Sequence, residues 1–392
     1  MKWVHPNLII GNKATGKYYF RRPEIEREIS IEIKKGNHVL VAAPRRVGKT
    51  SVMEYLKSNC DENWMCVMEN IQSISSENEL YKRMYELILS CLNTNKQLWN
   101  KLGDKFREIN LEEVGMEGKL KFGDKKQLDY KAEIDNLIPQ LPKEIKLVIF
   151  LDELPEVLHQ LNKANKKAEA NSLLKNLRRW RQGEEFNLLC LVVTGSIGLH
   201  HIVADITGRV TDNNDYGRVS FKPFNYKQAF DFIDFVTDSA TVKYSADLKL
   251  YLLDKIQYKI PYFINLILTE VDKKAFTLND VNITNDSIDD AFEKVILENE
   301  NFKDWKKRLF EYFEISNAKF MNDILIEIAH LGVMNKRKIY DLSRKRNKVD
   351  SYMELVKILV NDGYVVEQEH GYVFLSPFLA TFWKNDNPIF DE

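Results

Sequence analysis

Over the first half of the chain, short apolar runs alternate with segments of helical periodicity. The apolar runs predict β-strands at residues 39–42, 64–68, 147–151 and 188–193. The run 147–151 is apolar throughout, which indicates a strand buried on both faces, as in the centre of a parallel sheet. Between the runs, apolar residues three and four positions apart predict helices at 23–34, 51–56, 80–92, 128–137 and 171–182. This order of elements predicts an α/β fold with a parallel sheet.

From Phe224 onward the pattern is mainly helical. Apolar residues at helical spacing predict helices at 226–238, 246–257, 261–273, 287–297, 321–331, 338–346 and 350–361. The alternating residues 364–374, with a turn at Glu369-His370-Gly371, predict a β-hairpin. Three helices followed by a two-stranded hairpin are typical of a winged helix-turn-helix. We therefore predict three domains, at residues 1–224, 225–303 and 304–392, in a chain too long for a single core.

The loop after the first predicted strand has the pattern of a phosphate-binding loop. It comprises Ala43, Pro44, Arg45, Arg46, Val47, Gly48, Lys49, Thr50 and Ser51. Backbone N–H groups of such a loop, together with the following helix N-terminus, surround the β- and γ-phosphates of a nucleotide. Lys49 is then expected to reach the phosphates, and the Thr50 hydroxyl to bind Mg²⁺. Ala43 departs from the motif, which has Gly there, and the alternative is a basic loop before a surface helix.

Polar residues follow the two later strands. Asp152 and Glu153 come directly after the buried run 147–151, at the strand end where open α/β sheets bind ligands. Asp152 is predicted to hold Mg²⁺ opposite Thr50, and Glu153 to orient and deprotonate an attacking water. Thr194 or Ser196, after the next strand, is a candidate sensor of the γ-phosphate. The alternatives are two acids that cap a turn and an ordinary polar turn.

Composition and charge are those of an ordinary globular protein. The chain is 44% hydrophobic and 29% charged, and its formal net charge of −1 argues against a protein that coats polyanions over its whole surface. The four cysteines include no C-x-x-C pair, so we expect reduced thiols in a cytoplasmic protein. The N-terminus lacks a signal-peptide core, and no apolar run approaches membrane-spanning length. Residues 97–140 are highly charged and carry no recognisable chemistry, and Lys119–Phe122 within them predicts an edge strand or hairpin arm.

Taken in order, these segments resemble the prokaryotic AAA+-type ATPases of the archaeal-ATPase and signal-transduction (STAND) group. The resemblance covers nearly the whole chain. It rests on residues 20–26, the loop 43–51, Leu-Asp-Glu-Leu at 151–154, Thr-Gly-Ser-Ile-Gly-Leu at 194–199, Ile-Pro-Tyr at 260–262, and the softer 376–384. It implies a P-loop αβα parallel-sheet domain at 1–224, a helical lid at 225–303 and a winged helix at 304–392.

The resemblance also implies roles for single residues. Lys49 and Thr50 match the Walker A positions, and Asp152 and Glu153 match the Walker B acid and the catalytic base. Thr194 or Ser196 stands where the family keeps its first sensor. Arg22 lies near the place where the adenine is held, Pro261 begins the lid segment that can cover the base, and Asn70 resembles a residue that restrains the catalytic glutamate. An ordinary helix start is the alternative at Pro261.

Two features depart from the family pattern. Many AAA+ proteins have an arginine directly after the lid proline, whereas this chain has Tyr262 after Pro261. No motif fixes an arginine finger either, and the candidates are Arg178, Arg179, Arg181, Arg209 and Arg218. If such an arginine acts between subunits, hydrolysis depends on assembly, because a finger contributes roughly 10³–10⁵ in rate.

The expected function is ATP binding and Mg²⁺-dependent hydrolysis, coupled to assembly of a homo-oligomer. The tail carries Lys336-Arg337-Lys338 and Arg344-Lys345-Arg346-Asn347-Lys348, which provide positive charge for double-stranded DNA. Acidic residues lie among them, so a solvated basic face is the alternative. The second hypothesis is a nucleotide-dependent switch that controls a protein effector without binding DNA.

Overall fold

The computed structural model describes residues 2–94, 111–114, 120–122, 128–195, 199–208, 215–298 and 300–388. They form two compact units. The sheet unit comprises residues 21–42 and 49–221, and the helical unit comprises residues 1–20, 43–48 and 222–392. The division therefore falls inside the predicted phosphate loop, between Gly48 and Lys49. The predicted boundaries of three domains stay a prediction.

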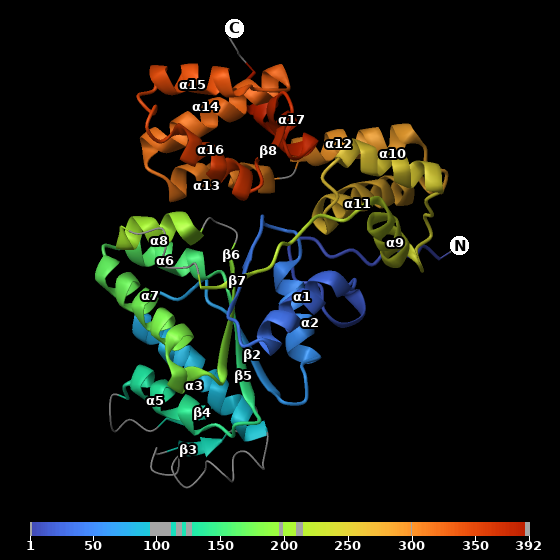
Figure 1. Ribbon diagram of the computed structural model, residues 1–392. Helices are drawn as coiled ribbons and strands as arrows, with labels where there is room; N and C mark the ends of the chain where they lie inside the picture. Colours follow the sequence, from blue (N-terminus) through green and yellow to red (C-terminus); the bar gives the residue numbers. More distant parts are fainter. Residues whose placement is uncertain are drawn as a thin grey trace. The chain divides into compact units, whose positions relative to one another are not determined.

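The sheet unit contains a five-stranded parallel sheet with helices on both faces (Figure 1). The strand order is β2-β5-β6-β1-β7. The strands are β1 (Val39–Ala42), β2 (Trp64–Asn70), β5 (Lys146–Asp152), β6 (Leu189–Gly195) and β7 (Gly217–Arg218). The helices are α1 (Pro23–Lys34), α2 (Lys49–Ser58), α3 (Glu77–Thr94), α5 (Tyr130–Leu137), α6 (Leu154–Lys163), α7 (Lys167–Gln182) and α8 (Leu199–Thr207). In Figure 1, α1 and α2 cover one face, and the others cover the opposite face. The predicted α/β parallel-sheet fold is confirmed.

Local sequence explains where these elements begin. Pro23 occupies the first turn of α1, where its missing N–H costs nothing. The hydroxyl of Ser76 accepts from the backbone N–H of Glu79 and so caps the start of α3. Strand β5 is buried from Leu147 to Asp152, as expected for an interior parallel strand.

Two features of the sheet unit add to the prediction. Helices α6 and α8 lie in segments for which the sequence pattern predicted no element. The predicted edge strand at 119–122 is β4 (Leu120–Phe122), which pairs antiparallel with β3 (Leu111–Val114), so it is a hairpin arm.

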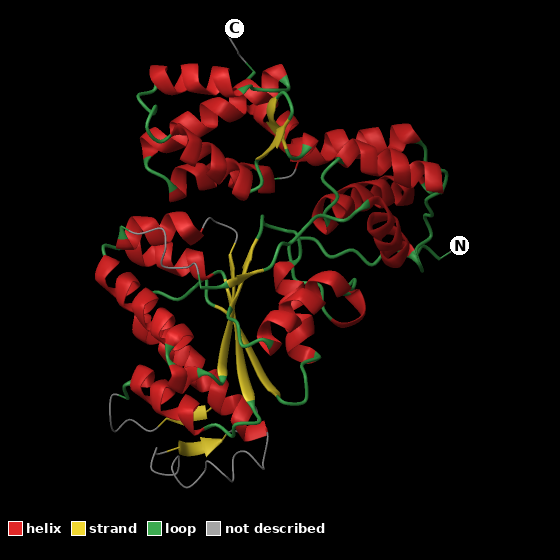
Figure 2. Ribbon diagram, in the orientation of Figure 1, coloured by secondary structure: helices red, strands yellow, loops and turns green. Residues whose placement is uncertain are grey.

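The helical unit consists of helices and one β-hairpin (Figure 2). The first group of helices is α9 (Tyr226–Thr237), α10 (Ala246–Ile256), α11 (Pro261–Leu278) and α12 (Asn285–Glu298). The second group is α13 (Asn301–Tyr312), α14 (Ile315–Leu331), α15 (Lys336–Lys345), α16 (Tyr352–Asn361), the hairpin β8 (Val365–Gln368) and β9 (Gly371–Phe374), and α17 (Pro377–Asp386). In the second group, α14, α15, α16 and the hairpin lie where the sequence predicts helices and a hairpin, whereas α13 and α17 were not predicted.

An aromatic cluster joins the two groups of the helical unit. The ring of Phe378 in α17 stacks against Phe292 of α12, with centroids 4.4 Å apart, and against Phe263 of α11 at 5.0 Å. Phe302 of α13 stacks on the same ring at 5.8 Å. Burial of large apolar rings is a main source of stability, so this cluster makes one core from four helices.

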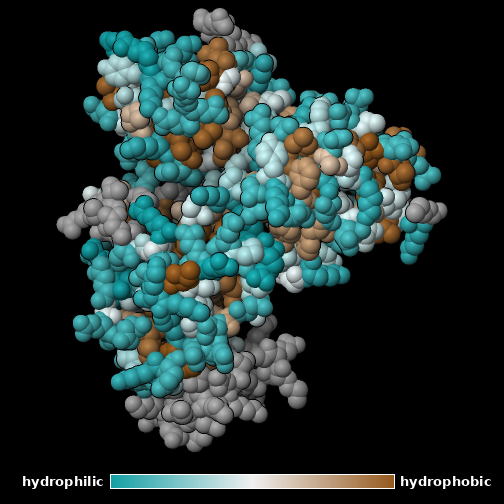
Figure 3. Space-filling model, turned by 45° about the vertical axis from the view of Figure 1, so that its right-hand side comes forward, coloured by the Kyte–Doolittle hydropathy of each residue, from teal (hydrophilic) through white to brown (hydrophobic). Residues whose placement is uncertain are grey.

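The surface of the protein is mostly hydrophilic on the face that Figure 3 shows. Hydrophobic residues appear there in small groups separated by hydrophilic ones. Among the helices that the structure describes, none combines the length and the apolar composition needed to cross a bilayer.

Candidate nucleotide-binding site

The carboxyl ends of the parallel strands bring the predicted acid and sensor together. Asp152 is the last residue of β5, and Thr194 lies at the end of the neighbouring β6. Asp152 is 1% exposed, and its Oδ1 accepts a hydrogen bond from the Thr194 hydroxyl. Its Oδ2 accepts one from the Thr50 hydroxyl of α2, at 2.6 Å. Both oxygens of this buried carboxylate are therefore held by hydroxyl groups that the sequence singled out.

The donor set around Asp152 fits Mg²⁺. A carboxylate and a hydroxyl are hard oxygen ligands, and Mg²⁺ binds through one or two carboxylates plus water and phosphate oxygens. Thr50 and Asp152 already lie within hydrogen-bond distance of each other, so one ion can contact both after only local adjustment. Lys49, the first residue of α2, is also buried, with 6% of its surface exposed.

Glu153 has a backbone conformation that few non-glycine residues adopt. Its φ of 66° and ψ of 38° lie in the left-handed region, at the cap position before α6. Such a conformation costs free energy and is concentrated at functional sites. The turn directs the chain from β5 into α6 within one residue. Glu153 is therefore the single residue between the end of β5 and the start of α6.

A glycine allows α6 to pack against the end of β6. A Cβ atom at Gly195 would lie 2.6 Å from Cδ of Pro155, in the first turn of α6. Because the proline ring is rigid, a larger residue at 195 would displace α6 or β6. The sequence assigned a role to Thr194 but none to Gly195; the structure shows that glycine is needed there for the close approach of Pro155 in α6.

The first part of the phosphate loop belongs to the helical unit. Ala43 is absent from the residues with positive φ, so the departure from the glycine motif causes no strain. Arg46 and Gly48 have positive φ instead, at 66° and 102°. The guanidinium of Arg46 lies 4.1 Å from the ring centroid of Tyr262, and its Nη2 donates to Oδ1 of Asn301 at 2.6 Å.

Tyr262 and Asn301 were not predicted as site residues. A signal existed for Tyr262, because it takes the place where many AAA+ proteins have an arginine. For Asn301 there was none, since it is separated from Arg46 by 255 positions and begins a helix that the periodicity did not reveal.

Three further residues that the sequence singled out lie in α11, before α1 and in β2. Pro261 is the first residue of α11. Arg22 is buried, its backbone N–H donates to Oε1 of Glu26 at 2.7 Å, and its guanidinium lies 5.0 Å from the Phe221 ring. Asn70, the last residue of β2, pairs in register with Asp152 of the neighbouring strand β5. Their nucleotide roles stay predictions. Ser196 lies outside the described residues.

The candidate arginine fingers differ in what already holds them. Arg181 is buried and donates to both carboxylate oxygens of Asp215, at 2.9 and 3.0 Å. Burial alone would raise the pKa of Asp215, but the hydrogen bonds and charge of Arg181 outweigh it and lower that pKa. Arg179 pairs with Asp135, and Arg178 donates to Gln182. Arg218 is an exposed residue of β7, and Arg209 lies outside the described residues. Arg181 therefore forms a structural ion pair with Asp215 inside the sheet unit.

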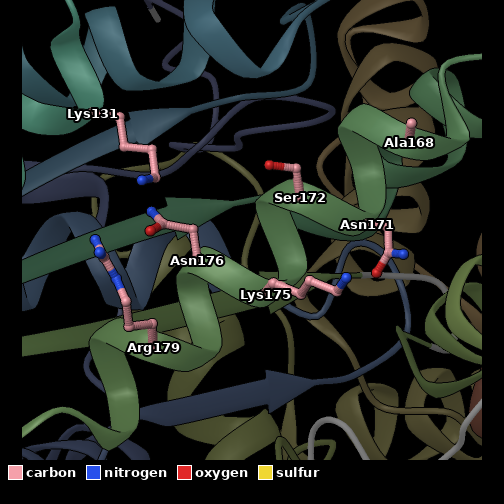
Figure 4. A pocket seen from close by; sticks show the side chains of 7 residues that line it. All are labelled: Lys131, Ala168, Asn171, Ser172, Lys175, Asn176 and Arg179. Carbon is pink, nitrogen blue, oxygen red and sulfur yellow. The ribbon is translucent and has the colours of Figure 1, made fainter.

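A hollow between α5 and α7 is lined by none of Thr50, Asp152 and Thr194 (Figure 4). Its volume is about 500 Å³, and Lys131, Asn176 and Arg179 point toward it. Asp135 beside it pairs with Lys131 at 3.6 Å and with Arg179, and accepts from the Trp180 indole at 2.6 Å. Lys131 and Arg179 thus share the single negative charge of Asp135, and we assign no ligand to the hollow.

Comparison with solved structures identifies the fold. No model of a known family and no curated protein matches the chain. The Walker-type ATPase Paby2304 of Pyrococcus abyssi superimposes with a TM-score of 0.60, at 17% identity, over 95% of this chain and 98% of that chain. This chain has the P-loop α/β fold of that Walker-type ATPase. The ORC2 protein of Aeropyrum pernix, in a structure of its ADPNP and ADP complexes, is also similar, with a TM-score of 0.51, 14% identity and coverage of 97% of this chain and 95% of that chain. Thr50, Asp152 and Thr194 lie together at the carboxyl end of the sheet, and their roles in nucleotide binding stay predictions.

Proposed function

We propose that this protein binds ATP with Mg²⁺ through residues 43–51 and hydrolyses it to ADP and phosphate. The observation that carries the proposal is the buried Asp152 carboxylate, held by the hydroxyls of Thr50 and Thr194 at the end of the sheet. The similar ORC2 structure contains ADPNP and ADP, which supports an adenine nucleotide here. The four free cysteines support the predicted cytoplasmic location, where disulfides are rare.

Each residue has one role in this proposal. Lys49 binds phosphate oxygens, and Thr50 and Asp152 hold Mg²⁺, which neutralises charge on the phosphates. Glu153 accepts a proton from the water that attacks the γ-phosphorus, as the bond to the β-phosphate oxygen breaks. Thr194 fixes the orientation of Asp152 through its hydroxyl. Ser196 is assigned to γ-phosphate sensing from its place directly after β6, and Pro261 to the adenine from its place at the start of α11. Arg22 is assigned to the adenine by resemblance alone.

Replacement of Lys49 tests nucleotide binding. We expect Lys49→Ala to abolish binding of MgATP, measured by calorimetry, because it removes the cation that contacts the phosphates. Lys57→Ala is the matched control, since Lys57 is a half-exposed lysine in the last turn of the same helix. Binding of MgATP by Lys49→Ala with wild-type affinity would refute the assignment of the loop.

Replacement of Glu153 separates binding from hydrolysis. We expect Glu153→Gln to bind ATP but to lose roughly 10²–10⁴ in turnover, the usual contribution of a general base. Glu144→Gln is the matched control, because Glu144 is exposed and precedes the opposite end of β5. Single-turnover release of phosphate measures the effect. Full turnover by Glu153→Gln would show that the base lies elsewhere.

We further propose that residues 304–392 contain a winged helix-turn-helix, that nucleotide binding controls assembly of a homo-oligomer, and that the winged helix binds double-stranded DNA. Helices α14, α15 and α16 and the hairpin β8–β9 support the winged-helix assignment. Helix α15 and the turn after it carry the basic clusters of this region. Their cations would contact DNA phosphates.

A specific observation favours the alternative, a switch that controls a protein effector without DNA. Several cations of α15 and the following turn are engaged within the helical unit. Lys336 pairs with Glu367 at 2.6 Å, and Arg346 pairs with Asp323 at 2.7 Å. The Lys348 ammonium donates to the Ser316 hydroxyl at 2.8 Å. Exposed ion pairs are weak, so DNA could displace them, but they reduce the charge presented to it.

A salt series distinguishes the two hypotheses. If the winged helix binds DNA, duplex affinity falls steeply with salt, with a slope that reports the number of phosphates contacted. The double variant Lys338→Ala and Arg344→Ala should then reduce that slope by about 2. The matched control is Lys303→Ala with Lys307→Ala on α13. Absence of ATP-sensitive binding at low salt, with ATP-dependent oligomers, would leave the effector switch.

A further inference from the structure

Arg46 is an unusual residue for its position in a tight phosphate loop. Its φ of 66° is in the left-handed region, which glycine adopts without strain and arginine does not. A strained conformation persists only where surrounding contacts maintain it, and such residues are concentrated at binding and switch sites. The side chain at 46 must therefore make contacts that offset the strain of the backbone.

Those contacts join the loop to two helices of the helical unit. The guanidinium lies over the ring of Tyr262, the second residue of α11, with 4.1 Å between the guanidinium carbon and the ring centroid. Its Nη2 donates to Oδ1 of Asn301, the first residue of α13, at 2.6 Å. Tyr262 is 4% exposed, so this cation–π contact is largely shielded from water and correspondingly stronger. One side chain thus fixes the loop to the starts of both helices.

A second contact fixes the same loop. A Cβ atom at Gly363, in the turn before β8, would lie 2.5 Å from Cγ of Pro44. Only a residue without a side chain allows this approach. Residues 44 and 46 are therefore both packed within the helical unit, on opposite sides of Arg45.

Among the residues that the structure describes, none accepts a hydrogen bond from the other terminal nitrogen of Arg46. This Nη1 is buried from solvent. A buried N–H of a cation without an acceptor is costly, and natural proteins rarely retain one without a use. An anionic oxygen is the acceptor that satisfies such a group best. The proposed ligand of this loop, a nucleoside triphosphate, supplies anionic oxygens.

We propose that Arg46 is a positioning residue that senses the terminal phosphate of the nucleotide and transmits its presence to α11 and α13. This inference rests on the proposed ATP site. Arg46 offers Nη1 to a phosphate oxygen, while Tyr262 and Asn301 hold the rest of its guanidinium. Tyr262 follows Pro261 at the position where many AAA+ proteins have an arginine. In this chain the arginine comes from the loop instead, and the guanidinium of Arg46 lies over the Tyr262 ring.

Arg46→Gly tests the sensing role, since glycine accepts the positive φ and the loop keeps its backbone conformation. We expect affinity for a non-hydrolysable MgATP analogue to fall about tenfold or more, as for loss of a charge-assisted hydrogen bond. Affinity for MgADP should change far less, because the contact is with the terminal phosphate. Calorimetry with both nucleotides gives the ratio, which a purely structural role would not change. Arg308→Ala is the matched control, because Arg308 lies over Tyr312 within α13.

Tyr262 tests the transmission. Tyr262→Ala should lower the ratio of MgATP to MgADP affinity as Arg46→Gly does, whereas Tyr262→Phe keeps the ring face and should retain the wild-type ratio. Hydrogen exchange should also show that the MgATP analogue protects the first turns of α11 and α13 in the wild-type protein and in Tyr262→Phe only.

The outcomes separate this inference from the ATP site itself. A wild-type affinity ratio in Arg46→Gly, or an equal loss for both nucleotides, would overturn the sensing role while Lys49→Ala still confirms the site. Unchanged binding by Lys49→Ala would instead refute the proposed function. Identical behaviour of Tyr262→Ala and Tyr262→Phe would overturn the role of the ring.

Discussion

The two parts of the phosphate loop differ in how their polar groups are satisfied. In the sheet unit, the Thr50 hydroxyl donates to one carboxylate oxygen of Asp152, and the Thr194 hydroxyl donates to the other. Both oxygens of this carboxylate therefore have a partner. In the helical unit, Arg46 has partners for part of its guanidinium, whereas no residue within the described ranges accepts from Nη1. The first arrangement holds ligand oxygens ready for a cation. The second leaves a donor that needs an anion.

This difference indicates different tasks for the two units. The acid and hydroxyls of the sheet unit are fixed by adjacent strands of one sheet, which suits groups that position a metal and a reacting water. Arg46 is fixed by side chains from two helices, which suits a group that reports occupancy to those helices. If this comparison is correct, perturbing the sheet unit should alter stability and metal binding, and perturbing the helical unit should alter selectivity and loop packing.

The largest expected effect is on the stability of the sheet unit and involves His38. Its Nδ1 accepts from the backbone N–H of Leu191 at 2.9 Å, beside the junction of β1 and β6. Burial, with smaller contributions from the nearby Arg181 and Lys146, lowers the pKa of His38 to about 4, although Asp215 opposes this. His38 takes up a proton near pH 6.5 in the unfolded chain but only near pH 4 in the folded chain. The titration of His38 therefore does not lower the free energy of unfolding above pH 6.5, and it lowers that free energy by about 3 kcal/mol as the pH decreases to 4.

His38→Asn removes this titration and keeps an acceptor for the Leu191 N–H. Urea unfolding followed by pulsed hydrogen exchange distinguishes peptides of β1 and β6 from those of α14 and α17. The wild-type sheet unit should lose stability between pH 6.5 and 4, and His38→Asn should lose much less. Equal losses in both proteins would show that His38 takes up its proton without unfolding the strand junction.

The next effect concerns the metal and Thr194. If Thr194 orients Asp152, then Thr194→Val should weaken Mg²⁺ binding about 10–100-fold, the usual result of losing a residue that supports a ligand. Thr194→Ser keeps the hydroxyl and should restore it. Thr207→Val, which removes a hydroxyl bonded to the Val203 carbonyl in α8, is the control. The Mg²⁺ concentration for half-maximal hydrolysis measures the change, and an unchanged value in Thr194→Val would mean that Thr50 alone positions Asp152.

The sequence predicted the sheet unit well because its information is local. An apolar run marks each long strand, and Gly48, Lys49 and Thr50 mark the loop by their spacing alone. Parallel strands bring their carboxyl ends to one edge, so the meeting of Asp152 with Thr194 followed from topology. The left-handed conformation of Glu153 and the need for glycine at 195 could not be predicted, because both depend on how tightly α6 packs against β6.

Most elements of the helical unit were predicted, apart from α13 and α17, but its contacts were not. Helical periodicity shows which residues face a core, but it does not identify the residue that a given side chain meets. Arg46, Tyr262 and Asn301 are far apart in sequence, and an arginine with positive φ has no sequence signature. The aromatic cluster around Phe378 was missed for the same reason, since α17 was read only as a soft family marker.

The smallest effect tests whether the phosphate loop packs within the helical unit. Gly363 has φ of 80° and would meet Pro44 if it carried a Cβ, whereas Gly332 has φ of 79° and no atom within 4 Å of the same position. Alanine at either residue suffers the same backbone strain, so the difference between Gly363→Ala and Gly332→Ala isolates the contact with Pro44. We expect that difference to be about 1 kcal/mol in the free energy of unfolding, at the low end for overpacking because Pro44 lies in a loop that can shift. Urea unfolding with hydrogen exchange of α14 and α17 peptides measures it. Equal destabilisation by the two alanines would mean that the loop does not remain against the turn before β8, and the contacts of Arg46 would then lose their support from Pro44.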